Sequence, residues 1–520
     1  MTLLKSSISL LAATGAVAFP RYPMYKRADV ESFINSQTPI SLQGVLNNIG
    51  ANGSLVSGAS SGIVVASPSK DDPDYFYTWT RDAGMTLAAL IEELRAGNAD
   101  LESTIQNYVD SQATLQSVDN PSGGLSDGSG LGEPKFNVDL SQFTDEWGRP
   151  QSDGPALRAS ALIAYGNYLA KNGSTSLVSS NIWPIVQNDL AYVGEYWNET
   201  GFDLWEEVEG TSFFTTAVQF KALVEGAAFA EALGETCDSC SVAPQILCHL
   251  QEFWDGSAIV SNSPTNGRAG VDANSVIASL NLFDPEAGCD DATFQPCSAK
   301  ALANHKVYVD SFRDIYGINS GIGAGKAVAT GRYSEDTYQG GNPWYLTTLA
   351  AAEQLYDALY QWDKQGSIDI TNVSLPFFTD LVNNTQTGSF ASSSSEYESI
   401  TSAVKAYADG FIGIVQAYTP SDGALAEQFS RDSGDPASAT LLTWSFASFL
   451  TTVARRNGQV PLSWGSSTAS EVPSQCSGET VAGTYASPSV GSWLSDALEI
   501  DLFRMAHLDA DAGIGFYHKS

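Results

Sequence analysis

The chain has 520 residues, of which 43% are hydrophobic, and its formal net charge is −34. This length allows one very large domain or two to three ordinary ones. So large an excess of negative charge argues against nucleic acid or an anionic membrane as a partner, and it suits a neutral substrate in an acidic medium.

The first residues have the features of a secretory signal peptide followed by a short propeptide. A basic residue, Lys5, precedes an apolar run over 8–18 that ends in a small-x-small cleavage signal. This run is too short to span a bilayer, and a dibasic pair follows at 26–27. We therefore predict that residues 1–27 are removed and that the mature chain is secreted and extracellular, with no transmembrane helix.

Apolar residues recur every three or four positions along most of the chain, which predicts amphipathic helices. The clearest case follows Pro343, which suits a first helical position, and continues to Gly366, a plausible stop. In chain order, helices are predicted over 30–48, 82–96, 103–118, 155–170, 181–197, 215–233, 301–315, 343–366, 399–418 and 438–456, and a weaker pattern covers 493–507. Strand alternation is rare, so we predict an all-α fold.

Long loops rich in Gly, Ser, Pro and Asp interrupt the helical pattern at 119–154, 255–275 and 319–341. They are longer than simple connectors, and such loops in a compact domain often carry function. No Ser/Thr/Pro-rich linker divides the chain. We therefore predict one domain over residues 28–476 and a tail over 477–520 whose role the sequence does not define.

Six cysteines follow the signal peptide, and an even number in a secreted protein indicates disulfides. Fifteen pairings are possible, and short loops favour two local bridges, which leave one long-range bridge. The favoured pairs are Cys237–Cys240, Cys289–Cys297 and Cys248–Cys476. A zinc site is the alternative, but only His249 adjoins a cysteine and no second histidine lies at ligand spacing, so we expect no metal and no other cofactor.

Five sequons predict surface glycans. Their acceptor residues are Asn52, Asn172, Asn198, Asn372 and Asn383.

Several loops mix aromatic, arginine and acidic residues. The stretch TGFDLWEEVEGTSFF (200–214) holds four carboxylates within seven residues beside a tryptophan and two phenylalanines. Similar mixtures occur in five further loops, PDYFYTWTRD (73–82), GLGEPKFNVD (130–139), EWGRPQSDGP (146–155), GRYSEDTYQGGNPW (331–344) and AEQFS (426–430). Aromatic rings stack on the apolar faces of a pyranose, and carboxylate and guanidinium groups bind its hydroxyls, so the mixture suits a sugar.

Cleavage of a glycosidic bond requires one carboxylic acid to protonate the leaving oxygen and one carboxylate to activate water or attack carbon. The proton donor needs a raised pKa, which apolar surroundings and like charges supply. Taken alone, an acidic stretch of this kind is more often a solvated turn, an Arg-Asp pair is more often a surface feature or the start of a helix, and a single tryptophan is more often a core residue. Together, the five loops favour a carbohydrate site, although spacing does not identify the glutamates that act.

At these loops, and from about Asp29 to Cys476, the chain resembles glycoside hydrolase family fifteen, the family of the fungal glucoamylases. The resemblance implies an (α/α)6 barrel of six inner and six outer helices with the site at one end. It also implies a monomeric enzyme that hydrolyses α-1,4 bonds, and α-1,6 bonds more slowly, from the non-reducing ends of starch and malto-oligosaccharides. Inversion would release β-D-glucose. The chain lacks the linker and starch-binding domain of many relatives, so we expect weaker attack on raw granules.

The resemblance assigns roles to particular residues. Glu206 corresponds to the general acid and Glu427 to the general base, and Asp203, which matches an aspartate proposed as proton acceptor, ranks second to Glu427. The substrate-binding residues implied are Tyr75, Arg81, Asp82, Trp147, Leu204, Trp205, Glu207, Arg332, Asp336, Trp344 and Trp444. The six cysteines match the three bridges of the family.

Two alternatives remain at this point. The first is another (α/α)6 glycosidase, such as a trehalase-like enzyme, which product analysis with maltose and trehalose would distinguish. The second is a non-catalytic carbohydrate-binding glycoprotein, which a glucose-release assay would distinguish.

Overall fold

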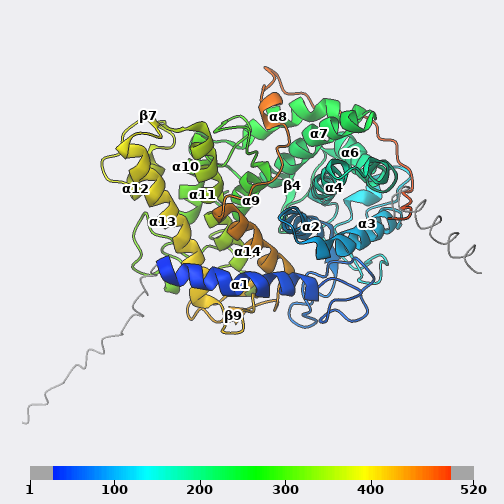
Figure 1. Ribbon diagram of the computed structural model, residues 1–520, viewed down its shortest axis with the longest axis horizontal. Helices are drawn as coiled ribbons and strands as arrows, with labels where there is room; N and C mark the ends of the chain where they lie inside the picture. Colours follow the sequence, from blue (N-terminus) through cyan, green and yellow to red (C-terminus); the bar gives the residue numbers. More distant parts are fainter. Residues whose placement is uncertain (1–26, 494–520) are drawn as a thin grey trace, which may run out of the picture.

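The computed structural model describes residues 27–493 (Figure 1). Apart from Arg27, the predicted leader lies outside the described residues, and so does the helix predicted over 493–507 apart from its first residue. None of the helices in the described part is long and apolar enough to cross a membrane.

Six helices form a closed inner ring. Each packs against the next along the chain, and the last returns to the first. The ring consists of α2 (Thr80–Arg95), α4 (Asp153–Lys171), α7 (Phe213–Leu233), α9 (Ala273–Leu282), α11 (Tyr345–Gln365) and α14 (Thr443–Arg456). These helices are buried on several sides, as the nearly continuous burial of α11 shows, which is why their sequences are apolar on more than one face.

Six further helices pack around the outside of this ring. They are α1 (Arg27–Asn47), α3 (Glu102–Gln116), α6 (Trp183–Tyr196), α8 (Ala243–Leu250), α10 (Ala299–Asp310) and α13 (Ser395–Tyr418). An outer helix buries a single stripe: in α1, Val30, Ile34, Gln37, Ser41 and Val45 are buried at three- or four-residue spacing. The fold is therefore an (α/α)6 barrel, to which the short helices α5 (Thr175–Leu177) and α12 (Leu375–Leu381) are added.

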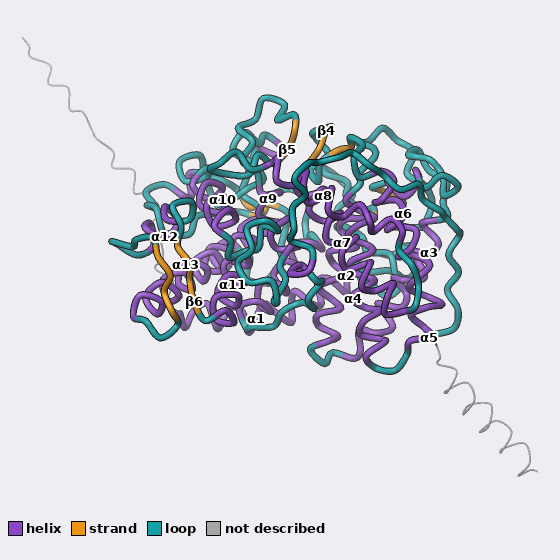
Figure 2. Tube along the Cα trace, turned by 90° about the horizontal axis from the view of Figure 1, so that it is seen from above, coloured by secondary structure: helices purple, strands orange, loops and turns teal. Residues whose placement is uncertain are grey.

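The strands are short and lie in the loops around the helical body (Figure 2). One antiparallel sheet has the order β3-β4-β5, and three antiparallel pairs join β1 with β2, β6 with β7 and β8 with β9. Their bounds are β1 (Thr78–Trp79), β2 (Lys135–Phe136), β3 (Gly201–Phe202), β4 (Glu209–Ser212), β5 (Asn262–Ser263), β6 (Ser367–Ile370), β7 (Gly388–Ala391), β8 (Gln428–Phe429) and β9 (Pro436–Ala437).

The helix predicted over 438–456 is wrong at its start, because α14 begins at Thr443. The strand β9 ends at residue 437, just before the predicted start, and Ser438 and Leu441 have positive φ angles of 63° and 50°, which an α-helix does not allow. The helix predicted over 301–315 ends earlier, at Asp310, and the short helices α5, α8, α9 and α12 were not predicted.

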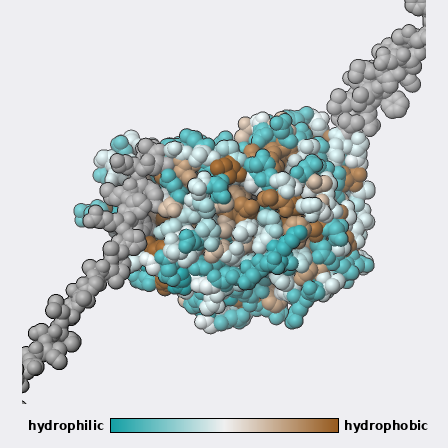
Figure 3. All heavy atoms as spheres, turned by 90° about the horizontal axis from the view of Figure 1, so that it is seen from below, coloured by the Kyte–Doolittle hydropathy of each residue, from teal (hydrophilic) through white to brown (hydrophobic). Residues whose placement is uncertain are grey.

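The predicted disulfide pairs are confirmed: Cys237–Cys240, Cys289–Cys297 and Cys248–Cys476. All five sequon asparagines are exposed. The most exposed large hydrophobic side chains of the described part, Ile40, Leu55, Val373 and Leu462, are each 37–40% exposed and come from distant parts of the chain. On the face seen from below, hydrophilic residues surround the hydrophobic ones (Figure 3).

Residues 477–493, here named the C-terminal strap, continue the packed body beyond the predicted domain end at 476. The strap is anchored by the Cys248–Cys476 disulfide and runs along α6 to α3 (Figure 1). Asn188 in α6 donates to the Ala486 carbonyl at 2.8 Å and accepts from its N–H at 3.1 Å. The Trp493 indole donates to Asp110 in α3 at 3.1 Å.

A buried ionic network joins three inner helices. Arg455 of α14 binds both carboxylate oxygens of Glu92 in α2, at 2.7 and 2.5 Å, and lies 3.5 Å from Asp357 in α11. Glu353, also in α11, accepts the Thr451 hydroxyl at 2.7 Å. Burial raises the pKa of Glu353 to about 7, against the opposing charge of Arg455.

This raised pKa predicts that stability falls between pH 4.5 and 7. The folded state retains the Glu353 proton in that window whereas the unfolded state releases it, so rising pH favours unfolding. Glu353→Gln should remove about 1–3 kcal/mol of that fall. Melting temperatures at the two pH values, at one scan rate, test this. Exposed Glu396→Gln is the control, and an equal fall in wild type and Glu353→Gln would contradict the assignment.

Candidate active site

The loops that lead into the inner helices carry the residues predicted for the site. Arg81 lies in the first turn of α2, Trp344 precedes α11, and Trp444 lies in the first turn of α14. Residues of these loops and of the β3–β4 turn line one cavity of about 670 Å³. The rigid ring thus supports the site, and the loops provide its side chains.

All but two of the predicted catalytic and substrate-binding residues line this cavity. Those that do are Tyr75, Arg81, Asp82, Trp147, Leu204, Trp205, Glu206, Glu207, Arg332, Trp344, Glu427 and Trp444. Asp203 and Asp336 are not among the lining residues, and both are buried behind the cavity wall.

Asp203 organises the turn that carries Glu206. Its carboxylate accepts the N–H groups of Glu207 and Val208 at 2.9 and 3.0 Å and the Asn262 amide at 3.1 Å. The Asp203 carbonyl accepts the Glu206 N–H at 2.8 Å. Glu206 itself has a φ of +65°, which is uncommon for a residue other than glycine and frequent at functional sites. These contacts favour a structural role for Asp203.

The Glu206 carboxylate is held through one of its oxygens. Oε1 accepts the Trp79 indole N–H at 2.7 Å, the Gln151 amide at 3.1 Å and the Arg81 guanidinium at 3.4 Å. The other oxygen, Oε2, takes no part in these bonds. Three donors on one oxygen fix the orientation of the carboxyl group and leave Oε2 for a ligand.

Arg81 is buried in a group of acids at the start of α2. It binds Asp153 at 3.0 Å and Gln151 at 2.8 Å and lies 3.9 Å from Asp82. Burial raises the pKa of Asp82 to about 6, although the Arg81 charge opposes the rise. A charged guanidinium and a carboxyl group therefore share this end of the cavity, as hydroxyl recognition requires.

Glu427 is 1% exposed and enters the cavity from the residue before β8. Its Oε2 accepts the Ser438 hydroxyl and the Gln428 amide, the latter at 3.2 Å. Burial raises the pKa of Glu427 to about 7, and the hydrogen bond from Ser438 opposes the rise. The positive-φ turn at Ser438 is what brings its hydroxyl to this carboxylate.

A second arginine–carboxylate group lies in the α10–α11 loop. Arg332 binds Asp336 through two parallel bonds of 2.8 and 2.7 Å and Glu207 through one of 2.9 Å. The rings of Trp205 and Trp344 lie 5.5 and 5.2 Å from its guanidinium carbon. Asp336 thus holds Arg332 from behind rather than facing the cavity.

Tryptophans form much of the cavity wall. Trp205 stacks on Trp444, with centroids 6.4 Å apart, and its indole donates to buried Asp272 at 2.7 Å. On the Trp147 side, the Lys135 ammonium lies 3.6 Å from the Trp147 ring centroid, and burial lowers the pKa of Lys135 to about 8.

The sequence missed several residues that hold the catalytic candidates in place. Gln151 and Trp79, which bind Glu206, lay in loops that the sequence had singled out. Asp272 lay in the long loop over 255–275 and Ser438 in a predicted helix, but nothing marked either residue itself, because only the folded chain brings them to Trp205 and Glu427.

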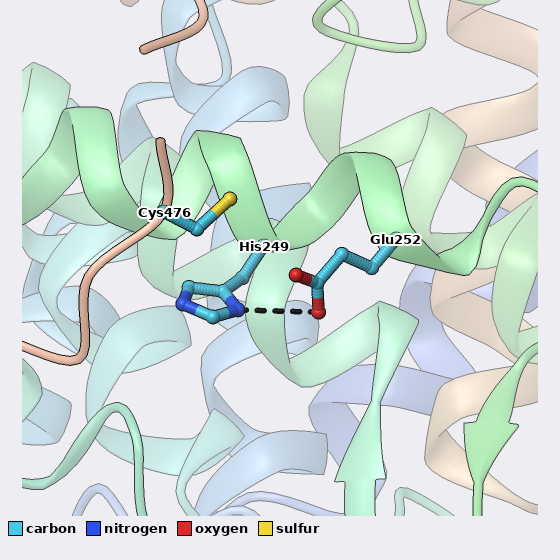
Figure 4. Close-up of side chains that lie close together, drawn as sticks. All are labelled: His249, Glu252 and Cys476. Carbon is cyan, nitrogen blue, oxygen red and sulfur yellow. Dashed lines mark hydrogen bonds and ion pairs between the residues drawn. The ribbon is translucent and has the colours of Figure 1, made fainter. Parts of the chain in front are cut away.

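Within residues 27–493, one group of potential metal ligands lies close together, His249, Glu252 and Cys476 (Figure 4). The Cys476 sulfur is bonded to Cys248, and His249 lies 3.3 Å from Glu252 one helical turn away. The group is therefore a disulfide beside a surface histidine–glutamate contact, and none of its residues lines the cavity.

The arrangement brings two carboxyl groups with different surroundings into one aromatic-walled cavity. One is fixed by indole, amide and guanidinium donors, and the other is buried beside a serine hydroxyl. An acid and a base in one cavity, with rings and arginines around them, are what cleavage of a glycosidic bond requires.

Comparison with known proteins gives matches over most of the chain. Residues 39–454 match the family described as glycosyl hydrolases family 15. A protein named glucoamylase from Neurospora crassa is 59% identical over 469 residues, which are 90% of this chain and 75% of that protein.

Two solved structures agree with these matches. The family 15 glucoamylase of Hypocrea jecorina has a TM-score of 0.88 at 56% identity and covers 89% of this chain and 78% of its own. The glucoamylase of Hormoconis resinae has a TM-score of 0.88 at 52% identity and covers 89% and 80%.

Proposed function

Because the chain belongs to glycosyl hydrolases family 15, we propose that its cavity binds the non-reducing end of an α-glucan and that Glu206 and Glu427 cleave the terminal bond. The enzyme is a glucan 1,4-α-glucosidase that hydrolyses starch and malto-oligosaccharides with inversion. The observation that supports this assignment of residues is that both glutamates line the same aromatic-walled cavity.

Glu206 acts as the general acid. Its Oε2 carries the proton and donates it to the glycosidic oxygen as the bond from C1 to that oxygen breaks. The donors on Oε1 hold the group in place during the transfer and stabilise the carboxylate that remains. The leaving sugar takes the proton as its new hydroxyl hydrogen.

Glu427 acts as the general base. It accepts a proton from a water molecule whose oxygen attacks C1 from the face opposite the leaving group, and so β-D-glucose forms. The two carboxyl groups are expected to lie roughly 6.5–9.5 Å apart with the ring and the water between them. Solvent then restores the proton to Glu206 and removes it from Glu427.

The remaining residues bind the sugar. Arg81 and Asp82 bind hydroxyls of the terminal glucose. Arg332 and Glu207, which belong to the second arginine–carboxylate group, bind further hydroxyls of the substrate. Trp147, Trp205, Trp344, Trp444 and Tyr75, with Leu204, provide the apolar walls. We assign Asp203 to the support of the β3–β4 turn and Asp336 to the support of Arg332. The enzyme acts as a secreted glycosylated monomer.

Anomer-resolved NMR of maltose digestion tests this function. The β-anomer of glucose should appear first, before mutarotation, and trehalose should not be cleaved. Initial release of the α-anomer would contradict the inverting roles of the two glutamates. Absence of glucose release would support a binding protein instead.

Ser438→Ala should move the acidic limb of the kcat/KM profile to higher pH. The hydroxyl binds the ionised form of Glu427, so its removal raises a pKa that is already high, and the base must be ionised to act. A shift of about 0.5–1 pH unit is expected from the loss of one hydrogen bond. Kinetics from pH 3 to 8 give the limb, and Ser430→Ala, in the same β8–β9 hairpin, is the control. An unshifted limb would contradict the role.

A further inference from the structure

Glu207 is held by three groups from two different loops. Arg332 binds its Oε1 at 2.9 Å, and on Oε2 it accepts bonds from Arg268 at 2.6 Å and from the Tyr333 hydroxyl at 2.5 Å. Glu207 and Arg332 line the cavity, whereas Arg268 and Tyr333 do not. Arg268 therefore reaches Glu207 from behind the cavity wall.

Arg268 comes from the loop between β5 and α9, and the loop is held in place next to this residue. Its guanidinium lies 3.8 Å from the Tyr333 ring centroid, and its side chain is 18% exposed. The next residue, Ala269, donates its N–H to Glu335 at 2.8 Å. Arg268 is thus sandwiched between a carboxylate and an aromatic ring, an arrangement that suits arginine and not lysine.

The charges around Glu207 favour its ionised form. Burial opposes ionisation, but Arg332, the Tyr333 hydroxyl and Arg268 together lower its pKa. The facing groups also include Asp203, whose charge repels it, and Asp336, which shares Arg332. Arg332 shares its charge with Asp336, to which it is bound by two bonds. Arg268, in contrast, has no carboxylate other than Glu207 within ion-pair distance in residues 27–493.

We propose that Arg268 is a positioning residue that fixes Glu207 for hydrogen bonding to substrate hydroxyls, and that it thereby determines how tightly the substrate binds. This inference rests on the proposed function, because it assumes that Glu207 contacts the sugar. Bonds on Oε2 from Arg268 and Tyr333 leave Glu207 one orientation. Without Arg268, Oε2 keeps only the bond from the Tyr333 hydroxyl, so the carboxylate is held less firmly and its geometry for the ligand is loosened.

Arg268→Met tests the proposal, since methionine keeps the apolar stem and removes the charge. KM for maltose should rise about tenfold, while kcat should change less than threefold, because a group that binds ground state and transition state alike affects KM. Arg268→Lys should recover only part of the loss. Arg313→Met is the matched control: Arg313 pairs with Asp310 at 2.5 Å outside the cavity lining, and KM should stay unchanged.

The pH dependence of KM separates positioning from a general loss of structure. Removal of Arg268 takes away one of the charges that lower the pKa of Glu207, so Glu207 should take up a proton at higher pH in Arg268→Met. The ratio of the variant's KM to wild-type KM should then grow as pH falls from 6 to 4, because the titration of Asp82 in the same cavity affects both proteins alike. The proposal would be overturned if KM of Arg268→Met were unchanged. It would also be overturned if kcat fell by the same factor as KM rose and the ratio of the two KM values did not vary with pH.

Glu207→Gln distinguishes this inference from the function on which it rests. A raised KM in Glu207→Gln with wild-type KM in Arg268→Met overturns only the role of Arg268. Wild-type KM in Glu207→Gln overturns the proposed contact between Glu207 and the sugar, and the role of Arg268 with it.

Discussion

Glu206→Gln should lower kcat for maltose by about 10²–10⁴-fold, the usual contribution of a general acid. Glutamine retains the carbonyl that accepts from Trp79, Gln151 and Arg81, so the turn and the cavity should keep their shape. Only the transferable proton is lost. Steady-state kinetics on maltose measure the effect, and KM should change little.

The leaving group shows whether Glu206 is the acid. The fluoride ion of α-D-glucosyl fluoride leaves without being protonated. The variant should therefore lose far less activity on this substrate than on maltose. Glu146→Gln is the matched control, because Glu146 lines the same cavity but is exposed, and its activity should stay within threefold of wild type. Equal losses on maltose and on the fluoride would contradict the acid role.

Glu427→Gln should lower kcat by a similar factor, about 10²–10⁴-fold, because water would have to attack without a base. Here the loss should be the same for maltose and for α-D-glucosyl fluoride, since both reactions need an activated water. The two variants therefore give opposite patterns with one pair of substrates. An unchanged melting temperature excludes unfolding as the cause.

If Glu427→Gln hydrolysed the fluoride at the wild-type rate, Glu427 would not be the base. Asp203 would then be the next candidate, and Asp203→Asn would separate its roles. If Asp203 only supports the turn, Asp203→Asn should lower the stability of the protein and disturb Glu206, because the bonds from the Glu207 and Val208 N–H groups are weakened. If Asp203 is the base, Asp203→Asn should lower kcat without lowering stability.

The sequence was sufficient where local pattern determines structure. Long amphipathic stretches such as α11 and α13 were predicted within a few residues, and short loops gave the right disulfide pairs. The motif around Glu206 identified a site because its residues are contiguous in the chain. Closure of the ring came from resemblance to a family, since periodicity alone does not show that α14 returns to α2.

What the sequence could not show depends on contacts between distant segments. Asp272 lies 67 positions from Trp205 and supports it through one hydrogen bond. Ser438 reaches Glu427 only because its backbone leaves the helical region. The sequence does not reveal this change in the backbone, and the helix was therefore wrongly predicted to begin at residue 438. The strap has no apolar period to reveal it, because polar bonds to α6 and α3 hold much of it.

The strap also affects how the gene can be shortened or fused. Truncation after Cys476 would preserve every cysteine and every catalytic candidate. It would, however, remove the hydrogen-bond partner of the Trp197 indole, which donates to the Glu479 carbonyl at 3.0 Å, and the partners of Asn188 and Asp110. Anyone adding a tag or a fusion partner should therefore place the junction beyond Trp493.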